Sequence, residues 1–188
     1  FVDDPLALAS DKRLDTPGIS ITSTSAQVSF FNNYDLESQV DGGVLEVSSP
    51  NINAGAFTDI TNAAVGGSFV IGGYNDEINP YATNSISGRR AWSGYSGGYI
   101  HTVANLGPNV AGQTINMRWR MGSDSSGTYS NLGWRIDTIA VTESTCAPTL
   151  LVTTANDHDD GVCSAADCTL REAILAANSR ARSLSPMP

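Results

Sequence analysis

Apolar and polar residues alternate along the segment 114–122, TINMRWRMG. A period of two places successive side chains on opposite faces of a β-strand, so we predict that one face of this segment enters a core and the other meets solvent. The apolar positions are Ile115, Met117, Trp119 and Met121. Segment 134–143 carries Trp134 and Ile136 on one side and Ile139 on the other, which predicts a central strand with apolar residues on both faces.

Five more segments are rich in β-branched and aromatic residues or alternate in the same way, and turn residues separate them. They are residues 19–22, 26–34, 43–48, 56–60 and 97–106. Seven short strands at this spacing predict a β-sandwich rather than a helical bundle. Residues 62–90 are rich in glycine and too long for a simple hairpin connection, so we expect a loop of the kind that often carries a binding site.

The composition changes near Pro148, which predicts a second, smaller part of the chain. There LLVTT (150–154) predicts one more strand, and LREAILAAN (170–178) predicts a helix with an apolar stripe. The stripe consists of Leu170, Ala173, Ile174 and Ala177. We therefore expect a chain that is cut across the joint between two modules. Its parts are a β-sandwich at 1–145, a linker at 146–149, the strand-plus-helix appendage at 150–179 and a tail at 180–188.

The charge of the chain narrows the classes of partner. It has 188 residues and a formal net charge of -9, with Lys12 as its one lysine. Electrostatic attraction to nucleic acid phosphates or anionic lipids is therefore disfavoured. No apolar run approaches the roughly 20 residues that cross a bilayer, so we expect no membrane insertion. The acidic surface offers oxygen ligands to a hard cation such as calcium, although solubility alone also explains such a charge.

The first of two resemblances covers about residues 14–141. The segments that carry it include DKRLDTPGISI, FNNYDLES, VDGGVLEVS, SGRRAWSGYSGGYI, MRWRMGSDSS and GWRIDTIAV. Together they resemble the jelly-roll modules of secreted bacterial multidomain proteins, above all the C-terminal modules of immune inhibitor A-type metalloproteases and, more distantly, MAM domains. The resemblance implies an all-β fold, an antiparallel β-sandwich of jelly-roll type, in a secreted or cell-surface protein.

The second resemblance covers residues 150–178. LVTTANDHDDGVCSAADCTLREAILAAN is similar to the CSLREA segment, which opens bacterial surface proteins whose following chain winds into a parallel β-helix; here Thr169 replaces the usual serine. The resemblance implies a cap helix and a disulfide between Cys163 and Cys168, whose spacing also suits a small disulfide loop better than a zinc knuckle. No β-helix follows, so we expect an exposed apolar stripe that folds back, pairs with another chain or is mobile. Cys146 is left free or paired between chains, so a dimer through Cys146 or through the cap helix is a hypothesis.

Carboxylates near the predicted strand ends are candidates for a metal site. Jelly rolls of the kind that this chain resembles often hold a structural calcium ion where the first, second and last strands meet, and calcium takes six to eight oxygen ligands. The candidate ligands are Asp11, Glu37, Asp41 and Asp137. The alternative is that Asp41 caps the DGG turn and Asp137 pairs with Arg118 or Arg120. A second candidate cluster is His158 with the neighbouring aspartates 157, 159 and 160, which could take a metal or form only a solvated turn.

Aromatic residues in the loops suggest a carbohydrate site. Sugar-binding modules stack pyranose rings on exposed aromatic faces, and polar neighbours bind the hydroxyls. The candidates are Tyr74, Tyr81 and Tyr95. Trp92, Trp119 and Trp134 are instead expected to pack in the core.

The sequence contains little that indicates catalysis. It has no pair of carboxylates in the E-x-D-x-x-E pattern, no G-x-S-x-G elbow and no H-E-x-x-H zinc motif. We therefore predict a non-catalytic accessory or adhesive module that binds a carbohydrate or protein ligand. The alternatives are a hydrolase of polysaccharides or esters, whose carboxylates converge only in the fold, and a purely structural spacer.

Overall fold

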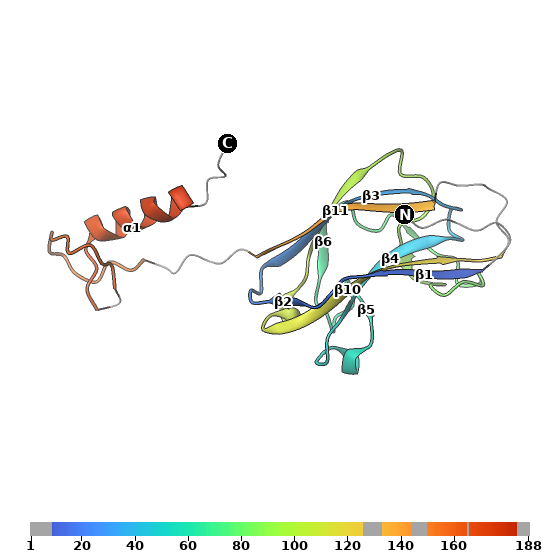
Figure 1. The fold of residues 1–188 in the computed structure, drawn as a ribbon, viewed down its shortest axis with the longest axis horizontal. Helices are drawn as coiled ribbons and strands as arrows, with labels where there is room; N and C mark the ends of the chain where they lie inside the picture. The colour runs from blue at the N-terminus through green and yellow to red at the C-terminus, as the bar shows by residue number, and fades with distance from the viewer. Residues whose placement is uncertain (1–8, 126–132, 144–149, 165, 184–188) are drawn as a thin grey trace. The chain divides into compact units, whose positions relative to one another are not determined.

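The computed structural model describes residues 9–125, 133–143, 150–164 and 166–183, the last five of them by their backbone only. The chain divides into two compact units, Phe1–Thr145 and Cys146–Pro188, which are described separately below. Strands form the first unit and the long helix belongs to the second (Figure 1).

Two antiparallel sheets make up the first unit. The five-stranded sheet has the order β1-β10-β4-β5, with β2 also paired to β10. Its strands are β1 (Ser10–Asp15), β2 (Ile19–Ile21), β4 (Gly42–Ser48), β5 (Thr58–Asp59) and β10 (Gln113–Ser123). The four-stranded sheet has the order β11-β3-β9-β6, so among the described strands β11 lies at the edge, and the expectation of a central strand at 134–143 was wrong. Its strands are β3 (Ala26–Asp35), β6 (Ser68–Ile71), β9 (Ile100–Asn105) and β11 (Gly133–Glu143).

Short elements complete the described part of this unit. A separate two-stranded sheet pairs β7 (Asp76–Glu77) with β8 (Arg90–Ala91). Two 3-10 turns, η1 (Asn53–Gly55) and η2 (Pro108–Val110), lie in the connections. The register of β11 against β3 shifts between Asp137 and Ala140, and Thr138 there has a positive φ of 52°, so β11 carries a bulge.

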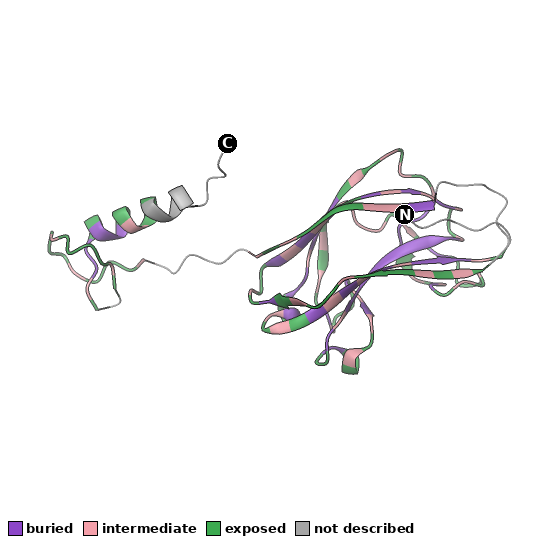
Figure 2. Cartoon of the chain, in the orientation of Figure 1, coloured by how far each residue is buried: buried purple, intermediate pink, exposed green. Residues whose placement is uncertain are grey.

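The core of the sandwich lies between the two sheets. Residues from β3, β9 and β11 of one sheet and from β4 and β10 of the other form one buried cluster. The four apolar positions of segment 114–122 are at most 2% exposed, as their alternation predicted, and strands of both sheets carry buried residues in Figure 2. Gly43 allows the close packing of this core, because a Cβ there would lie 2.7 Å from the Trp134 ring.

The all-β class and the antiparallel sandwich are confirmed, and each of the seven predicted segments contains a strand. The jelly-roll type stays a prediction. Four strands were not predicted: β1, β6, β7 and β8. Two of them, β6 and β7, lie within residues 62–90, where we expected a loop. The sequence did not reveal them, because strands this short, with glycines beside them, show little periodicity.

The second unit is organised around helix α1 (Leu170–Ser183) and the Cys163–Cys168 disulfide. Thr169 and Glu172 form a capping box: the Glu172 carboxylate accepts the Thr169 N–H at 2.8 Å, and the Thr169 hydroxyl accepts the Glu172 N–H at 3.2 Å. This arrangement explains the TLRE sequence, because each side chain satisfies a backbone N–H at the start of the helix. Among the described residues, no helix has the length and hydrophobicity needed to cross a membrane.

Two expectations for this unit were wrong. Residues 150–154 form no strand, because the backbone N–H of Thr153 bonds to the Cys168 carbonyl at 2.9 Å and ties the segment to the disulfide loop rather than to another strand. The helix also continues through residues 180–183, which we predicted to be tail. The linker, including Cys146, lies outside the described residues.

Candidate binding site

A short turn between β3 and β4, residues 36–41, carries two of the predicted metal ligands; we call it the acidic turn. The Glu37 carbonyl accepts the N–H groups of Val40 at 3.2 Å and of Asp41 at 2.9 Å, which closes the turn. Gln39 has a positive φ of 62°, a conformation that a non-glycine residue adopts only where the surroundings hold it.

The segments before and after β7 and after β8 hold the acidic turn in place. The buried Ser93 hydroxyl accepts the Gln39 N–H at 2.9 Å and donates to the Asp41 carbonyl at 2.7 Å. The Asn75 side chain clamps Ser93 in turn, with bonds of 3.0 and 2.9 Å to its N–H and carbonyl groups. The Asn79 N–H donates to the Gln39 carbonyl at 2.8 Å. The conformation of the turn is therefore fixed by residues far from it in the sequence.

The carboxylates of the acidic turn are unusually enclosed. The side-chain oxygen Oε2 of Glu37 is buried and has no hydrogen-bond partner among the described residues. Asp41 is 1% exposed, and its Oδ1 accepts the Asp124 N–H at 3.0 Å. A buried carboxylate oxygen without a partner costs free energy unless a cation or water satisfies it. Glu37 and Asp41 therefore suit a hard cation, for which carboxylate oxygens are the preferred ligands.

The structure does not gather the four predicted ligands into one group. Asp11 lies on β1 and pairs with Arg120 and Arg13 at 2.7 and 2.6 Å. Asp137 lies on β11 of the other sheet, opposite Phe31, and its carboxylate accepts the Thr138 N–H at 2.7 Å. Of the four predicted ligands, only Glu37 and Asp41 lie in one turn, so this pair is what stays as the predicted cation site. The four carboxylates were predicted to lie together because their strands were expected to meet, but the order of strands along the chain does not specify which strand ends are neighbours in a sandwich.

The alternative pairings weighed for these carboxylates are also absent from the described structure. Asp41 bonds to Asp124 rather than capping its own turn. Arg118 pairs with Asp15 at 2.7 Å, and Arg120 pairs with Asp11, so neither pairs with Asp137.

Tyr74, one of the three predicted ligand-stacking tyrosines, is part of the packed interior. Its ring contacts Phe69 and Trp92, with centroids 4.7 and 4.8 Å apart. Its hydroxyl accepts the Leu45 N–H at 2.9 Å and lies 3.1 Å from the Asp59 carboxylate. Burial, followed by the charge of Asp59, raises the pKa of Tyr74 well above its ordinary value. With its face and its hydroxyl engaged, Tyr74 is not available to stack on a ligand.

Tyr81 and Tyr95 are exposed and flank the acidic turn. Tyr81 is 90% exposed and Tyr95 is 72% exposed. Tyr81 follows Asn79 by two residues and Tyr95 follows Ser93 by two residues, and both of these anchors bond to Gln39. The two rings therefore come from segments that meet at the same turn, at the end of β3 where Tyr95 also bridges Asp35.

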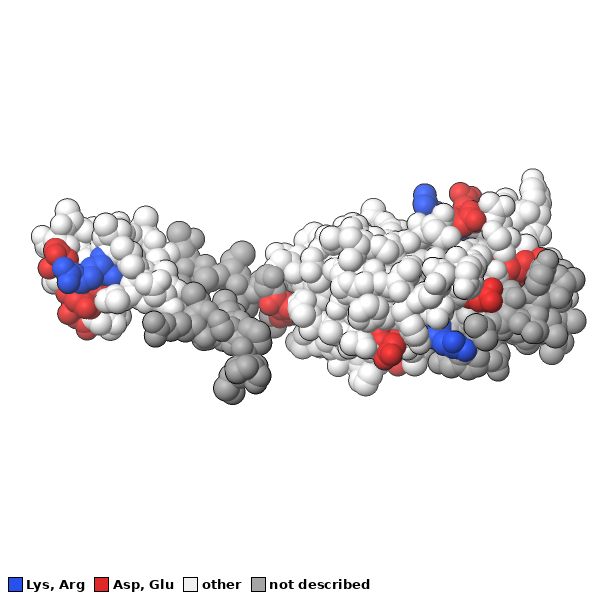
Figure 3. Space-filling model, turned by 90° about the horizontal axis from the view of Figure 1, so that it is seen from above, with Lys and Arg blue, Asp and Glu red and all other residues white. Residues whose placement is uncertain are grey.

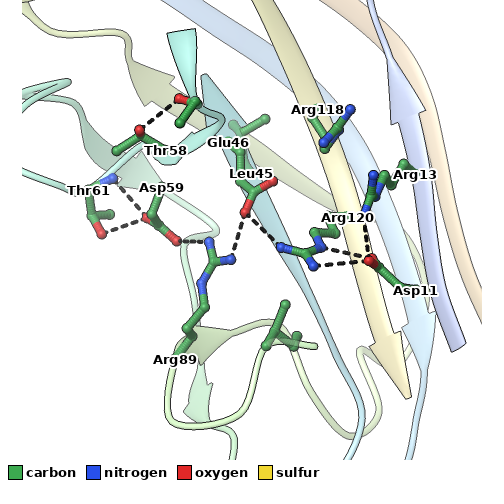
Figure 4. A network of polar contacts seen from close by, with 12 residues as sticks. Asp11, Arg13, Leu45, Glu46, Thr58, Asp59, Thr61, Arg89, Arg118 and Arg120 are labelled. Atoms are coloured by element: carbon green, nitrogen blue, oxygen red, sulfur yellow. Dashed lines mark hydrogen bonds and ion pairs between the residues drawn. The ribbon is translucent and has the colours of Figure 1, made fainter. Parts of the chain in front are cut away.

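A second polar group lies on the outer face of the five-stranded sheet (Figure 4). At its centre Glu46, 2% exposed, receives an ion pair from Arg89 at 2.6 Å and lies 3.6 Å from Arg120. Arg89 also pairs with Asp59 at 2.9 Å. Since Glu46 and Asp59 are direct partners across β4 and β5, Arg89 bridges two carboxylates on neighbouring strands.

Arginines hold two carboxylates on β1, Asp11 and Asp15, in the ionised form. The hydrogen bond from Arg120 keeps the pKa of Asp11 far below its ordinary value of 3.8, and Arg118 lowers the pKa of Asp15 in the same way. General acid catalysis in glycoside hydrolysis needs a carboxyl that stays protonated near neutral pH. Asp11 and Asp15, whose pKa values are lowered, are therefore suited to joining strands rather than to acting as such an acid.

The outer face of the four-stranded sheet carries an aromatic pair that the sequence analysis did not select. Phe31 on β3 stacks on His101 of β9, with centroids 4.9 Å apart and an interplanar angle of 27°. Phe31 is 39% exposed, whereas Phe30 beside it is buried. The adjacent phenylalanines at 30 and 31 could have predicted an aromatic residue on the outer face, because neighbouring residues of a strand point to opposite faces of the sheet.

Acidic side chains of the first unit lie at separate places on the face shown in Figure 3 rather than in one patch. On this face, the acidic side chains of the first unit therefore mark no single binding surface. No family model matches the chain, and no curated protein matches it. The resemblances to immune inhibitor A-type modules, to MAM domains and to the CSLREA segment remain predictions.

Proposed function

We propose that the chain is a non-catalytic accessory or adhesive module of a secreted or cell-surface bacterial protein, which binds a carbohydrate or protein ligand beside a structural calcium ion. The observation that carries the proposal is the buried oxygen Oε2 of Glu37, which has no described partner, in a turn flanked by two exposed tyrosines. Glu37 and Asp41 would bind the ion, and Tyr81 and Tyr95 would stack on the ligand.

Calcium would act on structure rather than on chemistry. An ion bound to Glu37 and Asp41 would satisfy the buried oxygen Oε2 of Glu37 and brace the turn at which the tyrosine-bearing segments meet. A ligand that binds only the folded state stabilises it by mass action, by about 2.7 kcal/mol at a concentration 100-fold above Kd.

The calcium assignment is tested by thermal unfolding with calcium and with chelator. We expect calcium to raise the Tm of the wild-type protein and of Glu77→Gln, which changes an exposed carboxylate on β7. Glu37→Gln should remove the calcium response. A wild-type Tm that is indifferent to chelator, or a calcium response that survives in Glu37→Gln, would contradict the assignment.

The ligand assignment is tested by polysaccharide pull-down or a glycan array. We expect Tyr81→Ala and Tyr95→Ala each to weaken binding about tenfold, because each removes a stacking face. The matched control is Phe31→Ala, which removes an exposed aromatic from the sheet face instead. Loss of binding in Phe31→Ala but not in the tyrosine variants would contradict the tyrosine site and would indicate that the ligand binds the outer face of the four-stranded sheet.

A hydrolase acting on polysaccharide or ester is the second candidate, and one observation favours it. Glu46 and Asp59 face each other across β4 and β5, so two carboxylates do converge in the fold. Turnover of a chromogenic glycoside or ester that Glu46→Gln abolishes would support an enzyme. If the protein neither turns over such substrates nor binds a ligand, the structural spacer is what remains.

Self-association belongs to the same proposal. On α1, Leu170, Ile174 and Leu175 are exposed by 63%, 52% and 51%, an apolar surface that a second chain could cover. Cys146 is the other proposed contact. A non-reducing gel and light scattering distinguish a dimer through Cys146 from a dimer through α1, because only the dimer through Cys146 disappears on reduction. A monomer in both measurements would rule out either dimer.

A further inference from the structure

A histidine and two carboxylates converge in the second unit. The ligand atoms of His158, Asp160 and Asp167 all lie within 4.8 Å of one another, and His158 Nε2 is 2.9 Å from Asp167 Oδ2. The sequence had placed His158 among its chain neighbours only. In the structure, Asp167 of the disulfide loop joins His158. Asp157 is not part of the group, because its carboxylate accepts two hydrogen bonds from Arg171, at 2.8 and 2.7 Å.

The backbone that carries the three side chains is anchored to the helix start. The Thr169 hydroxyl donates to the His158 carbonyl at 2.9 Å, and the Glu172 carboxylate accepts the Asp160 N–H at 2.9 Å. Asp167 directly precedes Cys168 of the disulfide. Thr169 and Glu172 are themselves buried, at 0% and 3% exposure, so the capping box that starts α1 also fixes the positions from which the three side chains project.

The spacing suits a small tetrahedral ion. Two ligand atoms that are each about 2.1 Å from a tetrahedral Zn²⁺ are about 3.4 Å apart, and the distances in this group run from 2.9 Å up to no more than 4.8 Å. An imidazole nitrogen beside carboxylates favours zinc-like ions, whereas calcium takes six to eight oxygens. The His158 and Asp167 side chains are 40% and 47% exposed, so an ion can enter from solvent and keep a water ligand.

We propose that His158, Asp160 and Asp167 bind one divalent transition-metal ion of the zinc class. This site is independent of the proposed calcium site in the acidic turn, since it lies in the other unit and uses a nitrogen ligand. The bound ion would join the residues 156–161 to the disulfide loop and so add a second cross-link to a unit with few buried residues.

Calorimetric titration of the oxidised full chain with Zn²⁺ tests the proposal. The chain has two histidines, so His101→Ala is the matched control for His158→Ala. We expect one zinc site in the wild-type protein and in His101→Ala, and a loss of affinity of at least about tenfold in His158→Ala. Absence of zinc binding at neutral pH, or loss of binding in His101→Ala with retention in His158→Ala, would overturn the proposal.

A second pair of variants guards against misfolding and identifies the carboxylate. Asp167→Asn should weaken zinc binding about tenfold or more, while Asp159→Asn, which changes an aspartate whose side chain accepts the Gly161 N–H, should leave the affinity unchanged. The helix signal in circular dichroism shows that each variant is folded. Equal affinities of the two variants, or calcium binding as tight as zinc binding at His158, would contradict the assignment.

Discussion

In the first unit, the three tryptophans Trp92, Trp119 and Trp134 are at most 2% exposed and lie in one core cluster. In the second unit, the buried residues among those described are Cys168, Thr169, Glu172 and Ala173. The first unit therefore has a large buried core that contains all three tryptophans. The second is held by a disulfide and by the polar bonds of a helix cap, and it leaves Leu170, Ile174 and Leu175 largely exposed.

The difference follows from the size of the two units. Burial of apolar surface stabilises a domain by about 25 cal/mol per Å², and a segment of about 40 residues encloses too little surface to balance the entropy of folding. Small units therefore depend on disulfides, metals or a covering partner. The comparison predicts that the first unit is most sensitive to changes in the core and the second to changes in its cross-links.

The largest expected effect is that of a core truncation in the sandwich. Trp92 packs against Phe30, Phe69, Tyr74 and Trp134. Trp92→Ala should lower the free energy of unfolding by about 4 kcal/mol, because it leaves a large cavity and removes the indole N–H that donates to the Gly72 carbonyl. All three tryptophans lie in the first unit, so urea unfolding followed by fluorescence of the remaining two reports on that unit.

The control for this prediction is Tyr81→Ala, which truncates a side chain that is 90% exposed and should change stability by less than about 0.5 kcal/mol. A Trp92→Ala variant as stable as Tyr81→Ala would show that the sandwich core does not dominate the stability of the first unit.

Removal of the disulfide tests the second half of the comparison. The double change Cys163→Ser and Cys168→Ser should destabilise the second unit by about 2 kcal/mol, because the unfolded chain regains the freedom of the closed loop. The helical signal in circular dichroism and protease resistance of the C-terminal part should fall, while the tryptophan unfolding transition stays unchanged. Retention of the helix in the double variant would mean that the disulfide is not what holds this unit.

A smaller effect is expected from the helix cap. Thr169→Ala removes the hydroxyl that bonds to the Glu172 N–H and the His158 carbonyl, and should cost the second unit about 1 kcal/mol. Thr169→Ser keeps the hydroxyl and should retain the helix signal in thermal unfolding followed by circular dichroism. If both variants behave alike, the cap does not contribute measurably to the stability of α1.

The smallest effect concerns pH and the first unit. The folded pKa values of Asp11 and Asp15 lie below their ordinary value of 3.8, so their ion pairs stabilise the sandwich above about pH 4 and are lost as the pH falls further. Asp11→Asn should remove about 1 kcal/mol at pH 7 and flatten the loss of stability below pH 4. A pH profile of stability that Asp11→Asn does not alter would contradict this assignment.

The candidate sites were predictable only in part. The exposure of Tyr81 and Tyr95 agrees with their place in glycine-rich loops, but Tyr74 has similar neighbours in the sequence and packs against Trp92. Glu37 and Asp41 lie in one turn, as their closeness in the chain implies, and their role as metal ligands stays a prediction. Asp11 and Asp137 could not be excluded in advance, because their partners come from strands whose neighbours the sequence does not specify.

Local patterns in the sequence by themselves determined seven of the described strand segments, the inward faces of Trp119 and Trp134, and the capped helix. Each of these depends on residues within a few positions of one another, where the period of two or of 3.6 acts directly. Only the tertiary structure decided that Arg89 bridges Glu46 and Asp59, that Ser93 holds the acidic turn, and that Asp167 joins His158. These contacts join residues from separate segments, and their formation depends on how strands and loops pack rather than on any local pattern.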